Sequence, residues 1–510
     1  MAEAQAGDQL EPQAGTALSQ TVRIDGSAAE ATFSAGALAW RPSGGGGERR
    51  RLELDSEVLG VRVEGRALKV ATFSSGDEAG AGRSSLSSRP LARGGGRARG
   101  DRRKGEVVVE MESEEAAATW GDAMRDHLAS LGRPKRLLII VNPYGGKRGG
   151  RRIFQTEVLP LIEAAGILYT MQETKHRLHA QEIAHSLDLR KYDGIVCVSG
   201  DGVLVEVVNG LLQREDWKTA IKIPLGIIPA GTGNGMAQSL LHLAGESFSV
   251  SNAVLAIVRG HKRALDVTSV VQGKIRFFSV LMLTWGLVAD IDIESEKYRW
   301  MGSARLDIYT LIRVVNLRRY NGCVLFVPAP GYEGFGHPVE QITSCKSNGD
   351  STGVQGDRSN DCDDETCAYA DPSIDETDLE WRSLDGPFVS VWVSGVPFAS
   401  EDVMAAPEAN FGDGYLDVAI IKDCPWSVVL GLVFQMRDGS YVKSPYVEYF
   451  KVKALRIEPG MRVGGGGKGG IIDSDGEVIA RGDEVDHLMA YGPPIQLTVD
   501  QGLATIFSPR

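Results

Sequence analysis

Three glycine-rich turns are the parts of this sequence best suited to chemistry. They are residues 142–147 (NPYGGK), 199–202 (SGDG) and 229–235 (PAGTGNG). Glycine lets backbone N–H groups approach a phosphate closely, and a helix that starts behind such a turn adds positive potential. One such turn is weak evidence, but three of them predict a site that binds a nucleotide or a polyphosphate.

Asp201 lies between the two glycines of the second turn, where a carboxylate would repel a phosphate. A carboxylate is expected there if Mg²⁺ lies between the two groups, or if a substrate hydroxyl must lose a proton. The alternative is that Asp201 only caps the helix behind it by accepting backbone N–H bonds. The two other phosphate-type turns favour the chemical role.

Two familiar nucleotide fingerprints do not match these turns. The sequence has no GxxxxGK[ST] motif, which argues against a P-loop kinase. The third turn lacks the GxGxxG spacing of a Rossmann dinucleotide site.

The residues around the turns predict a doubly wound α/β domain over 133–262. Apolar segments at 136–141, 167–174, 193–198 and 223–231 alternate with helical patterns. Strands that alternate with helices form parallel sheets, and ligands bind at the carboxyl ends of those strands. Because each turn follows a predicted strand, the three turns are expected to meet at one edge of the sheet.

The first 132 residues have a different pattern. Residues 1–19 are expected to be a disordered tail, and 20–132 contain short alternating segments followed by one helix with Ser113 as its cap. A β module closed by one helix resembles a pleckstrin-homology-like domain. Within it, residues 75–105 form a flexible basic loop that either attracts anionic lipid or is a solvated linker.

Residues 263–510 are rich in strands and predict a β-sandwich domain. An apolar and basic helix at 305–319 interrupts the strands, and so does a polar, acidic insertion at 334–384 that is expected to be disordered. The predicted fold class is therefore α/β plus β: a small pleckstrin-homology-like β module, a doubly wound parallel-sheet nucleotide domain and a β-sandwich.

Composition limits the classes of function. A net charge of −12 argues against a nucleic-acid-binding protein. The six cysteines have no CxxC spacing, which argues against a zinc site and fits a reducing compartment. The first residues do not resemble a signal peptide, and no apolar run has the length of a membrane span. We expect a cytoplasmic protein that can still attach to a membrane surface.

Taken together, the three turns resemble the diacylglycerol-kinase-type catalytic domain of lipid kinases. Residues 290–299 (DIDIESEKYR) and 475–477 (DGE) resemble the sphingosine kinases in particular. The resemblance covers residues 135–330 and 386–508 in the same order. The N-terminal module fits the larger, plant-like members and ceramide kinase better than the compact sphingosine kinases.

This resemblance implies roles for individual residues in a cleft between two domains. Asp201 becomes the general base that takes the proton of the substrate hydroxyl. Arg299 and Arg305 reach the phosphates from the second domain, and Asp475 also completes a magnesium site. Tyr144 occupies a position that varies in the family and has no role of its own. The implied ATP site comprises Asn142, Pro143, Tyr144, Gly145, Gly146, Lys147, Thr174, Ser199, Gly200, Gly202, Glu206, Gly231, Thr232, Gly233, Asn234, Arg299, Arg305, Asp475, Gly476 and Glu477.

The resemblance also implies a lipid site, to which residues 199–202 contribute. Asp292 is expected to pair with the ammonium of a sphingoid base, which ceramide and diacylglycerol lack. The alternative is an exposed charge among neighbouring acids. Ile308, Leu311 and Ile312 are expected at the tips of a helix that gates the lipid pocket or touches the membrane, or else they belong to the core.

The predicted function is transfer of the ATP γ-phosphate to the primary hydroxyl of sphingosine or a related long-chain base, with ATP and Mg²⁺ as cofactors. Ceramide kinase and diacylglycerol kinase are alternatives. A non-catalytic lipid sensor is a remote one, which the intact Asp201 argues against. We expect no nucleic-acid partner and peripheral association with an intracellular membrane, either vacuolar or plasma membrane. The sequence leaves the oligomeric state open.

Overall fold

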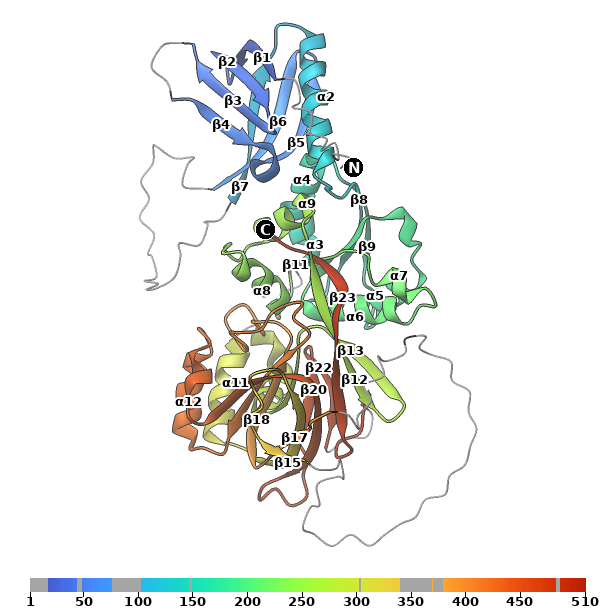
Figure 1. Ribbon diagram of the computed structural model, residues 1–510, viewed down its shortest axis with the longest axis vertical. Helices are drawn as coiled ribbons and strands as arrows, with labels where there is room; N and C mark the ends of the chain where they lie inside the picture. Colours follow the sequence, from blue (N-terminus) through green and yellow to red (C-terminus); the bar gives the residue numbers. More distant parts are fainter. Residues whose placement is uncertain are drawn as a thin grey trace, which may run out of the picture.

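The computed structural model arranges the chain in three parts along its long axis (Figure 1). An N-terminal sheet lies at one end, an α/β part lies in the middle, and a β-rich C-terminal part lies at the other end. No helix in the described part of the chain is long and apolar enough to cross a bilayer. The structure describes residues 17–43, 48–75, 102–145, 149–301, 304–339, 369, 379–482 and 487–510.

The N-terminal part is an antiparallel sheet closed by one long helix, α2 (Glu114–Ser130), which packs on it through Trp120 and Met124. As predicted, Ser113 caps α2, because its Oγ accepts a hydrogen bond from the Ala116 N–H at 3.1 Å. The predicted β module with one helix is therefore confirmed. In sheet order the strands are β4 (Arg50–Glu53), β3 (Ala37–Pro42), β2 (Ser27–Ser34), β1 (Leu18–Ile24), β7 (Arg102–Glu110), β6 (Ala67–Ser75) and β5 (Val58–Glu64), with the short helix α1 (Leu54–Glu57) between β4 and β5.

The strands of this part extend into both segments that were predicted to be irregular. β1 begins at Leu18, inside the expected tail 1–19. β6 and β7 remain paired from Ala67–Glu110 to Ser75–Arg102, so the ends of the predicted loop 75–105 are strand. Two neighbouring strands form backbone hydrogen bonds for as long as they stay paired, whatever side chains they carry. The rest of the loop lies outside the described residues.

The α/β part contains a parallel sheet in the order β9-β8-β10-β11, and helices cover both of its faces. β9 and β10 lie on opposite sides of β8, so the strand order reverses there, and ligands bind at such a point. The predicted doubly wound fold is confirmed. Its elements are β8 (Arg136–Val141), α3 (Gly150–Ile153), η1 (Phe154–Val158), α4 (Leu159–Ala164), β9 (Leu168–Glu173), α5 (His179–Ser186), η2 (Leu189–Lys191), β10 (Gly194–Ser199), α6 (Asp201–Leu212), α7 (Trp217–Ala220), β11 (Leu225–Pro229), α8 (Gly235–Leu243) and α9 (Val250–Arg259).

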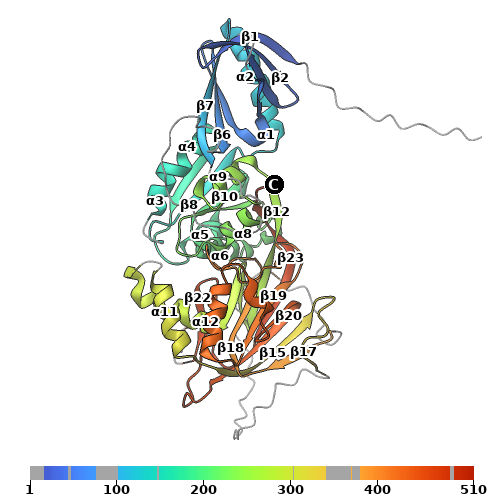
Figure 2. The same ribbon diagram turned by 90° about the vertical axis from the view of Figure 1, so that its left-hand side faces the viewer.

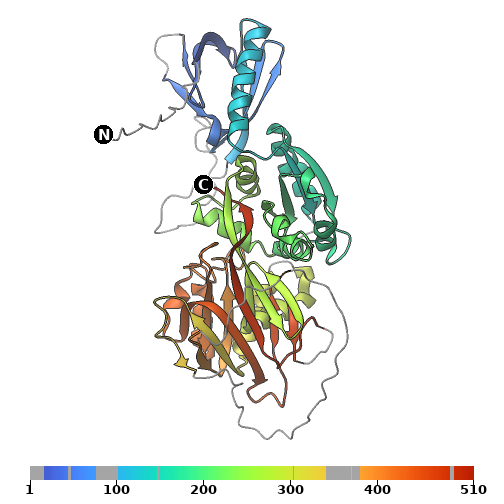
Figure 3. The ribbon, with the colours of Figure 1, turned by 45° about the vertical axis from the view of Figure 1, so that its right-hand side comes forward.

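Two long strands, β12 (Lys262–Gln272) and β23 (Ile495–Phe507), join the middle part to the C-terminal part (Figure 3). They pair with each other, and near the end of β23 Ile506 lies beside Leu225 of β11. The first half of β23 pairs with β20 (Val447–Arg462). Backbone hydrogen bonds therefore connect the nucleotide sheet directly to the β-rich part.

The C-terminal part has the predicted β-sandwich architecture, with Trp285, Tyr320 and Phe450 among the fully buried side chains of its core. The remaining strands are β13 (Ile275–Ser279), β14 (Met282–Gly286), β15 (Tyr320–Pro328), β16 (His337–Pro338), β17 (Arg382–Asp385), β18 (Phe388–Ser394), β19 (Leu416–Lys422), β21 (Ile471–Ser474) and β22 (Glu477–Arg481).

The prediction of one helix in this part is wrong, because the described residues contain three α-helices. α11 (Ala304–Val315) lies within the predicted segment, but α10 (Leu287–Ser295) and α12 (Trp426–Gln435) were not expected. α10 alternates apolar and acidic residues as a strand does, and α12 is apolar over its first nine residues except for Ser427. Neither sequence has the 3.6-residue period that identifies a helix. Short 3-10 helices η3 (Glu296–Met301) and η5 (Ser440–Lys443) are also present.

The acidic insertion predicted at 334–384 is ordered at both ends. β16 and β17 pair with each other there, and β17 also pairs with β15. Pairing with a sandwich strand satisfies the backbone groups of these residues, although their side chains are polar. Most of residues 340–378 lie outside the described part of the chain.

Tyr369, within that insertion, is buried against the α/β part. Its ring lies 4.8 Å from Trp217 and 5.0 Å from Phe278, and its carbonyl accepts a 2.7 Å hydrogen bond from Arg276. Tyr369 is therefore fixed by two aromatic contacts and one hydrogen bond.

Candidate active site

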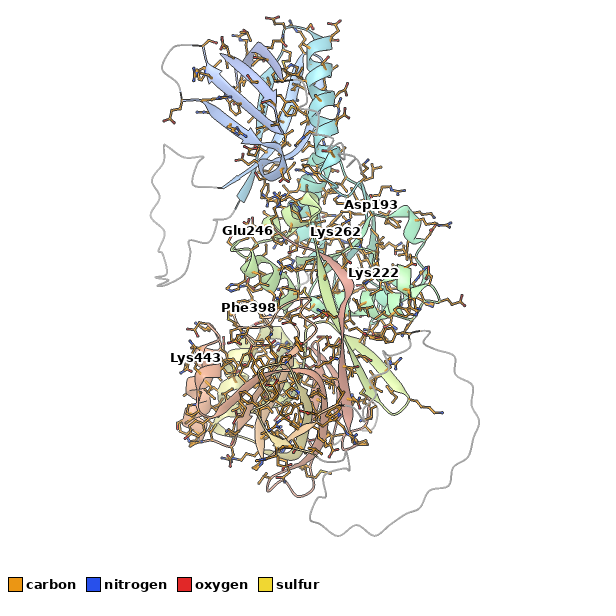
Figure 4. The ribbon with its side chains drawn as sticks, viewed as in Figure 1. Asp193, Lys222, Glu246, Lys262, Phe398 and Lys443 are labelled. Atoms are coloured by element: carbon orange, nitrogen blue, oxygen red, sulfur yellow. The ribbon has the colours of Figure 1, made fainter. Side chains whose placement is uncertain are left out.

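The candidate site lies where the α/β part meets the C-terminal part, below α6 and α8 in Figure 2. Figure 4 places Phe398 at this boundary and Lys222 further up, within the α/β part. The Phe398 N–H donates to Ser239 on α8 at 2.9 Å, and Lys222 donates to the Leu503 carbonyl at 2.8 Å. A Cβ on Gly235 would lie 2.4 Å from the Phe398 carbonyl oxygen, so glycine is required at this contact. The two parts thus touch at the N-terminus of α8.

Asp201 lies at that same helix terminus. It begins α6, but its carboxylate crosses to α8 and accepts hydrogen bonds from the Gly235 N–H at 2.7 Å and the Met236 N–H at 3.1 Å. The capping alternative is therefore correct in kind but names the wrong helix, because Asp201 caps α8 and not α6. The buried carboxylate is held at the edge of the sheet where the turns meet.

The glycines of the turns have two different roles. A Cβ on Gly231 would lie 2.3 Å from the Gly200 Cα, so these two turns need glycine because they pack on each other. Nothing lies within 4 Å of the Cβ position of Gly202, and Thr232 and Gly233 are exposed. Gly202, Thr232 and Gly233 are therefore free to face a ligand.

Two asparagines shape the turns through their side chains. Asn142 Oδ1 accepts hydrogen bonds from the N–H groups of Tyr144 at 2.9 Å and Gly145 at 3.2 Å. Asn234 exchanges two bonds, both of 3.1 Å, with the backbone of Gly231. These side chains fix the turn conformation, which is a role that the sequence reading did not assign to them.

The other predicted nucleotide residues of this part surround the sheet edge. Thr174 and Ser199 are buried where β9 and β10 end. Glu206 accepts hydrogen bonds from the N–H groups of Leu178 at 3.0 Å and Ala180 at 3.1 Å, so it caps α5. Burial raises the pKa of Glu206, and these two bonds oppose that rise.

Asp475 enters the site from the turn between β21 and β22. Both Asp475 and Gly476 have positive φ, at 53° and 85°. The Asp475 carboxylate accepts hydrogen bonds from the N–H groups of Met282 at 2.8 Å, Leu281 at 3.1 Å and Val280 at 3.4 Å. The carboxylate is therefore oriented by the backbone between β13 and β14.

Glu477, two residues further on, connects the two parts of the site. It forms an exposed ion pair of 2.9 Å with Arg177, which lies between β9 and α5. Its charge also acts on Glu206 and Asp292. The predicted DGE segment therefore lies beside the nucleotide turns, as a site between two domains requires.

The two central acids influence each other across the boundary. Burial raises the pKa of Asp201 to about 7; the bonds from Gly235 and Met236 lower it, and repulsion from Asp475 raises it. Burial likewise raises the pKa of Asp475 to about 6. A pKa near 7 leaves part of Asp201 ionised at neutral pH, and the ionised carboxylate is the form that accepts a proton.

Asp292 differs from its neighbour Asp290 on the same helix. Asp290 is buried and bonds to the Tyr320 hydroxyl at 2.5 Å and Arg318 at 3.1 Å, so it holds α10 to the sandwich. Asp292 is partly buried; burial raises its pKa to about 6, and Arg305 lowers it. Asp292 is therefore not the exposed charge of the alternative interpretation.

Asp473 is an acid that the sequence reading missed. It is fully buried, and burial raises its pKa well above the usual range. Repulsion from Asp292 and Asp475 raises that pKa further, and the Gly476 N–H opposes the rise. No strand-face signal in the sequence marks it, because the chain turns at Asp475 and Gly476 between β21 and β22.

The three predicted gate residues on α11 are exposed: Ile308, Leu311 and Ile312 lie on its outer face, while Tyr309 and Val314 are buried. α11 is thus apolar on two sides, as the sequence indicated. Its outer side chains do not belong to the core of the described structure.

Four of the residues predicted to bind ATP remain to be placed: Arg305, Gly146, Lys147 and Arg299. Arg305 is buried and pairs with Glu296, while its charge acts on Asp292. Gly146, Lys147 and the side chain of Arg299 lie outside the described part of the structure. Contact of these residues with phosphate stays a prediction.

Comparison with known proteins agrees with this geometry. The diacylglycerol kinase catalytic domain matches residues 136–270, and the YegS C-terminal NAD kinase beta sandwich-like domain matches 369–487. Sphingosine kinase 1 of Arabidopsis thaliana is 50% identical over 97% of this chain and 96% of its own length. The chain belongs to the sphingosine kinase family.

Two further relatives match this chain at lower sequence identity. Sphingosine kinase 2 of Arabidopsis thaliana is 48% identical and covers 96% of both chains. Human ceramide kinase is more distant, at 30% identity over 69% of this chain and 67% of its own length. As a member of this kinase family, the chain uses ATP.

Proposed function

We propose that this chain transfers the γ-phosphate of ATP to the primary hydroxyl of sphingosine or a related sphingoid long-chain base. The observation that carries the proposal is the buried carboxyl of Asp201, with a pKa of about 7, among the nucleotide turns and the C-terminal acids. A general base works best when its pKa is near the operating pH. Membership of the sphingosine kinase family supplies the class of substrate.

In the reaction, Asp201 accepts the proton of the substrate hydroxyl. The hydroxyl oxygen forms its bond to the γ-phosphorus while the bond from that phosphorus to the bridging β-phosphate oxygen breaks, which leaves ADP and a phosphorylated lipid. The Gly235 and Met236 N–H groups hold the carboxylate and leave it acceptor capacity for the hydroxyl. Backbone N–H groups of the exposed glycine turns face the phosphates.

Asp475 fits a magnesium ion in this scheme. Mg²⁺ binds carboxylate oxygens together with substrate phosphates, and the hydrogen bond from the Val280 N–H to Asp475 Oδ2 is long, at 3.4 Å. That oxygen therefore retains acceptor capacity. When bound, the ion would neutralise negative charge on the phosphates.

The lipid enters from the C-terminal part in this proposal. Asp292 binds the ammonium of the sphingoid base and so disfavours neutral lipids. The exposed apolar row on α11, with Leu311 54% exposed, contacts the surface of an intracellular membrane, where the long-chain base is located.

The test is phosphorylation of sphingosine, ceramide and diacylglycerol, compared side by side with purified protein, ATP and Mg²⁺. The Asp201→Asn variant is the catalytic control, and Asp126→Asn, at an exposed position on α2, is the matched charge control. We expect product from sphingosine with wild type and Asp126→Asn, and at least about 100-fold slower formation with Asp201→Asn.

Product from ceramide or diacylglycerol at a similar rate would contradict the assignment of substrate. Failure of the wild type on every lipid would contradict the kinase proposal itself and favour a lipid sensor.

A further inference from the structure

Asp473 and Thr284 are buried polar residues without their full complement of partners. Each is 1% exposed. Asp473 Oδ1 and Thr284 Oγ have no hydrogen-bond partner among the described residues. They lie directly opposite each other on the antiparallel strands β21 and β14. Opposite residues point to the same face with Cβ atoms about 5 Å apart, so the two unpaired groups form one feature.

That feature lies on the face of the sheet covered by α10. Trp285 and Ile472, the next residues along β14 and β21, belong to the sandwich core. Strand alternation therefore turns Thr284 and Asp473 to the opposite face. Trp392, which pairs with Thr284 from β18, packs there with residues of α10. Asp292, the predicted reader of the lipid headgroup, lies on that same helix.

Asp473 lies among other carboxylates, of which Asp292 is attracted to Arg305. The carboxylates of Asp292, Asp475 and Glu477 repel its charge, and the Gly476 N–H donates a hydrogen bond to it. Arg177 pairs with Glu477, and Asp475 is held by backbone N–H groups. Buried carboxylates that repel one another lower stability unless a cation or a proton lies between them. Asp473 itself keeps one buried oxygen, Oδ1, without a hydrogen-bond partner in the described structure.

The missing partner can be deduced from donor and acceptor counts. A primary ammonium has three N–H donors and no acceptor. Asp292, Asp473 and Thr284 together offer three acceptor groups on one side of the site. Mg²⁺ would instead require near-octahedral oxygen coordination, to which the same three groups offer two carboxylates and one hydroxyl. The chemistry therefore favours an ammonium group.

We propose that Asp473 and Thr284 bind the ammonium of the sphingoid base together with Asp292, so that the amine lies between two carboxylates and a hydroxyl. This inference rests on the proposed function. Because Asp473 contacts the charge and not the chain, it determines selection of an amine-bearing lipid over a neutral one of the same length.

The experiment compares wild type with Asp473→Asn and Thr284→Val, using the full chain. The measured quantities are the KM for sphingosine, the KM for ATP, the KM for Mg²⁺, and the inhibition constant of a deamino analogue with the same chain and hydroxyls. We expect Asp473→Asn to raise the KM for sphingosine about 10- to 100-fold. The other three quantities should stay within about threefold of wild type.

Each outcome separates this inference from the proposed function. If the wild type does not phosphorylate sphingosine, the proposed function fails and takes this inference with it. If the wild type does so and Asp473→Asn has an unchanged KM for sphingosine, the inference alone is overturned. If the KM for Mg²⁺ rises instead, Asp473 is a metal ligand. If sphingosine and the deamino analogue lose affinity equally, its role is structural. Either result overturns the inference.

Thermal unfolding gives an independent readout. Because Thr284 Oγ is unpaired in the fold, Thr284→Val should leave the midpoint unchanged or raise it, while it weakens sphingosine binding. A lowered midpoint would mean that the hydroxyl has a partner within the protein, and it would overturn the role of Thr284.

Discussion

The nucleotide half and the lipid half of the site hold their polar side chains in different ways. In the α/β part, Asn142, Asp201 and Glu206 all accept hydrogen bonds from backbone N–H groups. In the C-terminal part, Asp473 and Thr284 each have a buried oxygen without a partner in the described structure. A satisfied side chain fixes its loop, whereas an unsatisfied one lowers stability until a ligand pairs with it. The fold thus completes the nucleotide half, and the substrate completes the lipid half.

The largest expected effect comes from breaking the nucleotide half at Asp201. Asp201→Asn keeps the size of the side chain but removes the proton acceptor, so kcat for sphingosine should fall about 10²- to 10⁴-fold. The affinity for ATP, measured by equilibrium binding, should change much less. A kcat within about tenfold of wild type would leave Asp201 as a cap of α8 alone.

The next effect sharpens the role of the lipid half. Asp292→Asn removes a charge from the headgroup site, so the KM for sphingosine should rise about 10- to 100-fold, while the KM for ATP stays near that of wild type. Asp307→Asn, at an exposed position on α11, is the matched control. Parallel loss of ATP and sphingosine binding would contradict the division between the two halves.

The pH dependence tests the burial of Asp201. The base must be ionised, so kcat/KM should fall about tenfold for each pH unit below its pKa of about 7. Stability should change in the opposite direction. Between its usual pKa of 3.8 and about 7, folded Asp201 keeps a proton that the unfolded chain has lost, so the free energy of unfolding falls as pH rises.

Asp201→Asn should lose the acid limb of the rate profile. Its stability should depend less steeply on pH than that of wild type, because the raised pKa values of Asp292, Asp473 and Asp475 remain. Rate–pH profiles and denaturant unfolding between pH 4 and pH 8 measure these two dependences. If kcat/KM of the variant still falls at low pH as in wild type, that fall is due to another titrating group.

The smallest effect concerns the shape of the first turn. Asn142→Ala removes two hydrogen bonds to backbone N–H groups, each contributing about 0.5–1.5 kcal/mol. The KM for ATP should rise several-fold, and the KM for sphingosine should change little. If both change equally, the turn is not specific to the nucleotide half.

Much of the fold could be predicted from the sequence because its signals are local. β10 and β11 are continuous apolar runs and are buried along their whole length. The cap at Ser113 and the turns after β8, β10 and β11 were identified from residue types alone. α10 and α12 were missed because one alternates like a strand and the other has no period.

The sequence by itself determined the parallel sheet, the three turns at its edge, and the acids Asp201, Asp292 and Asp475 as candidates. These features follow from local patterns of apolar and glycine residues along the chain, and from the family that the motifs resemble.

Only the tertiary structure decided how those acids are used. Asp201 caps a helix 34 residues further along the chain, β23 returns from the C-terminus to the nucleotide sheet, and Asp473 is buried opposite Thr284. Burial and long-range pairing depend on which distant segments come together, and the pKa values and unpaired oxygens of the site follow from that packing.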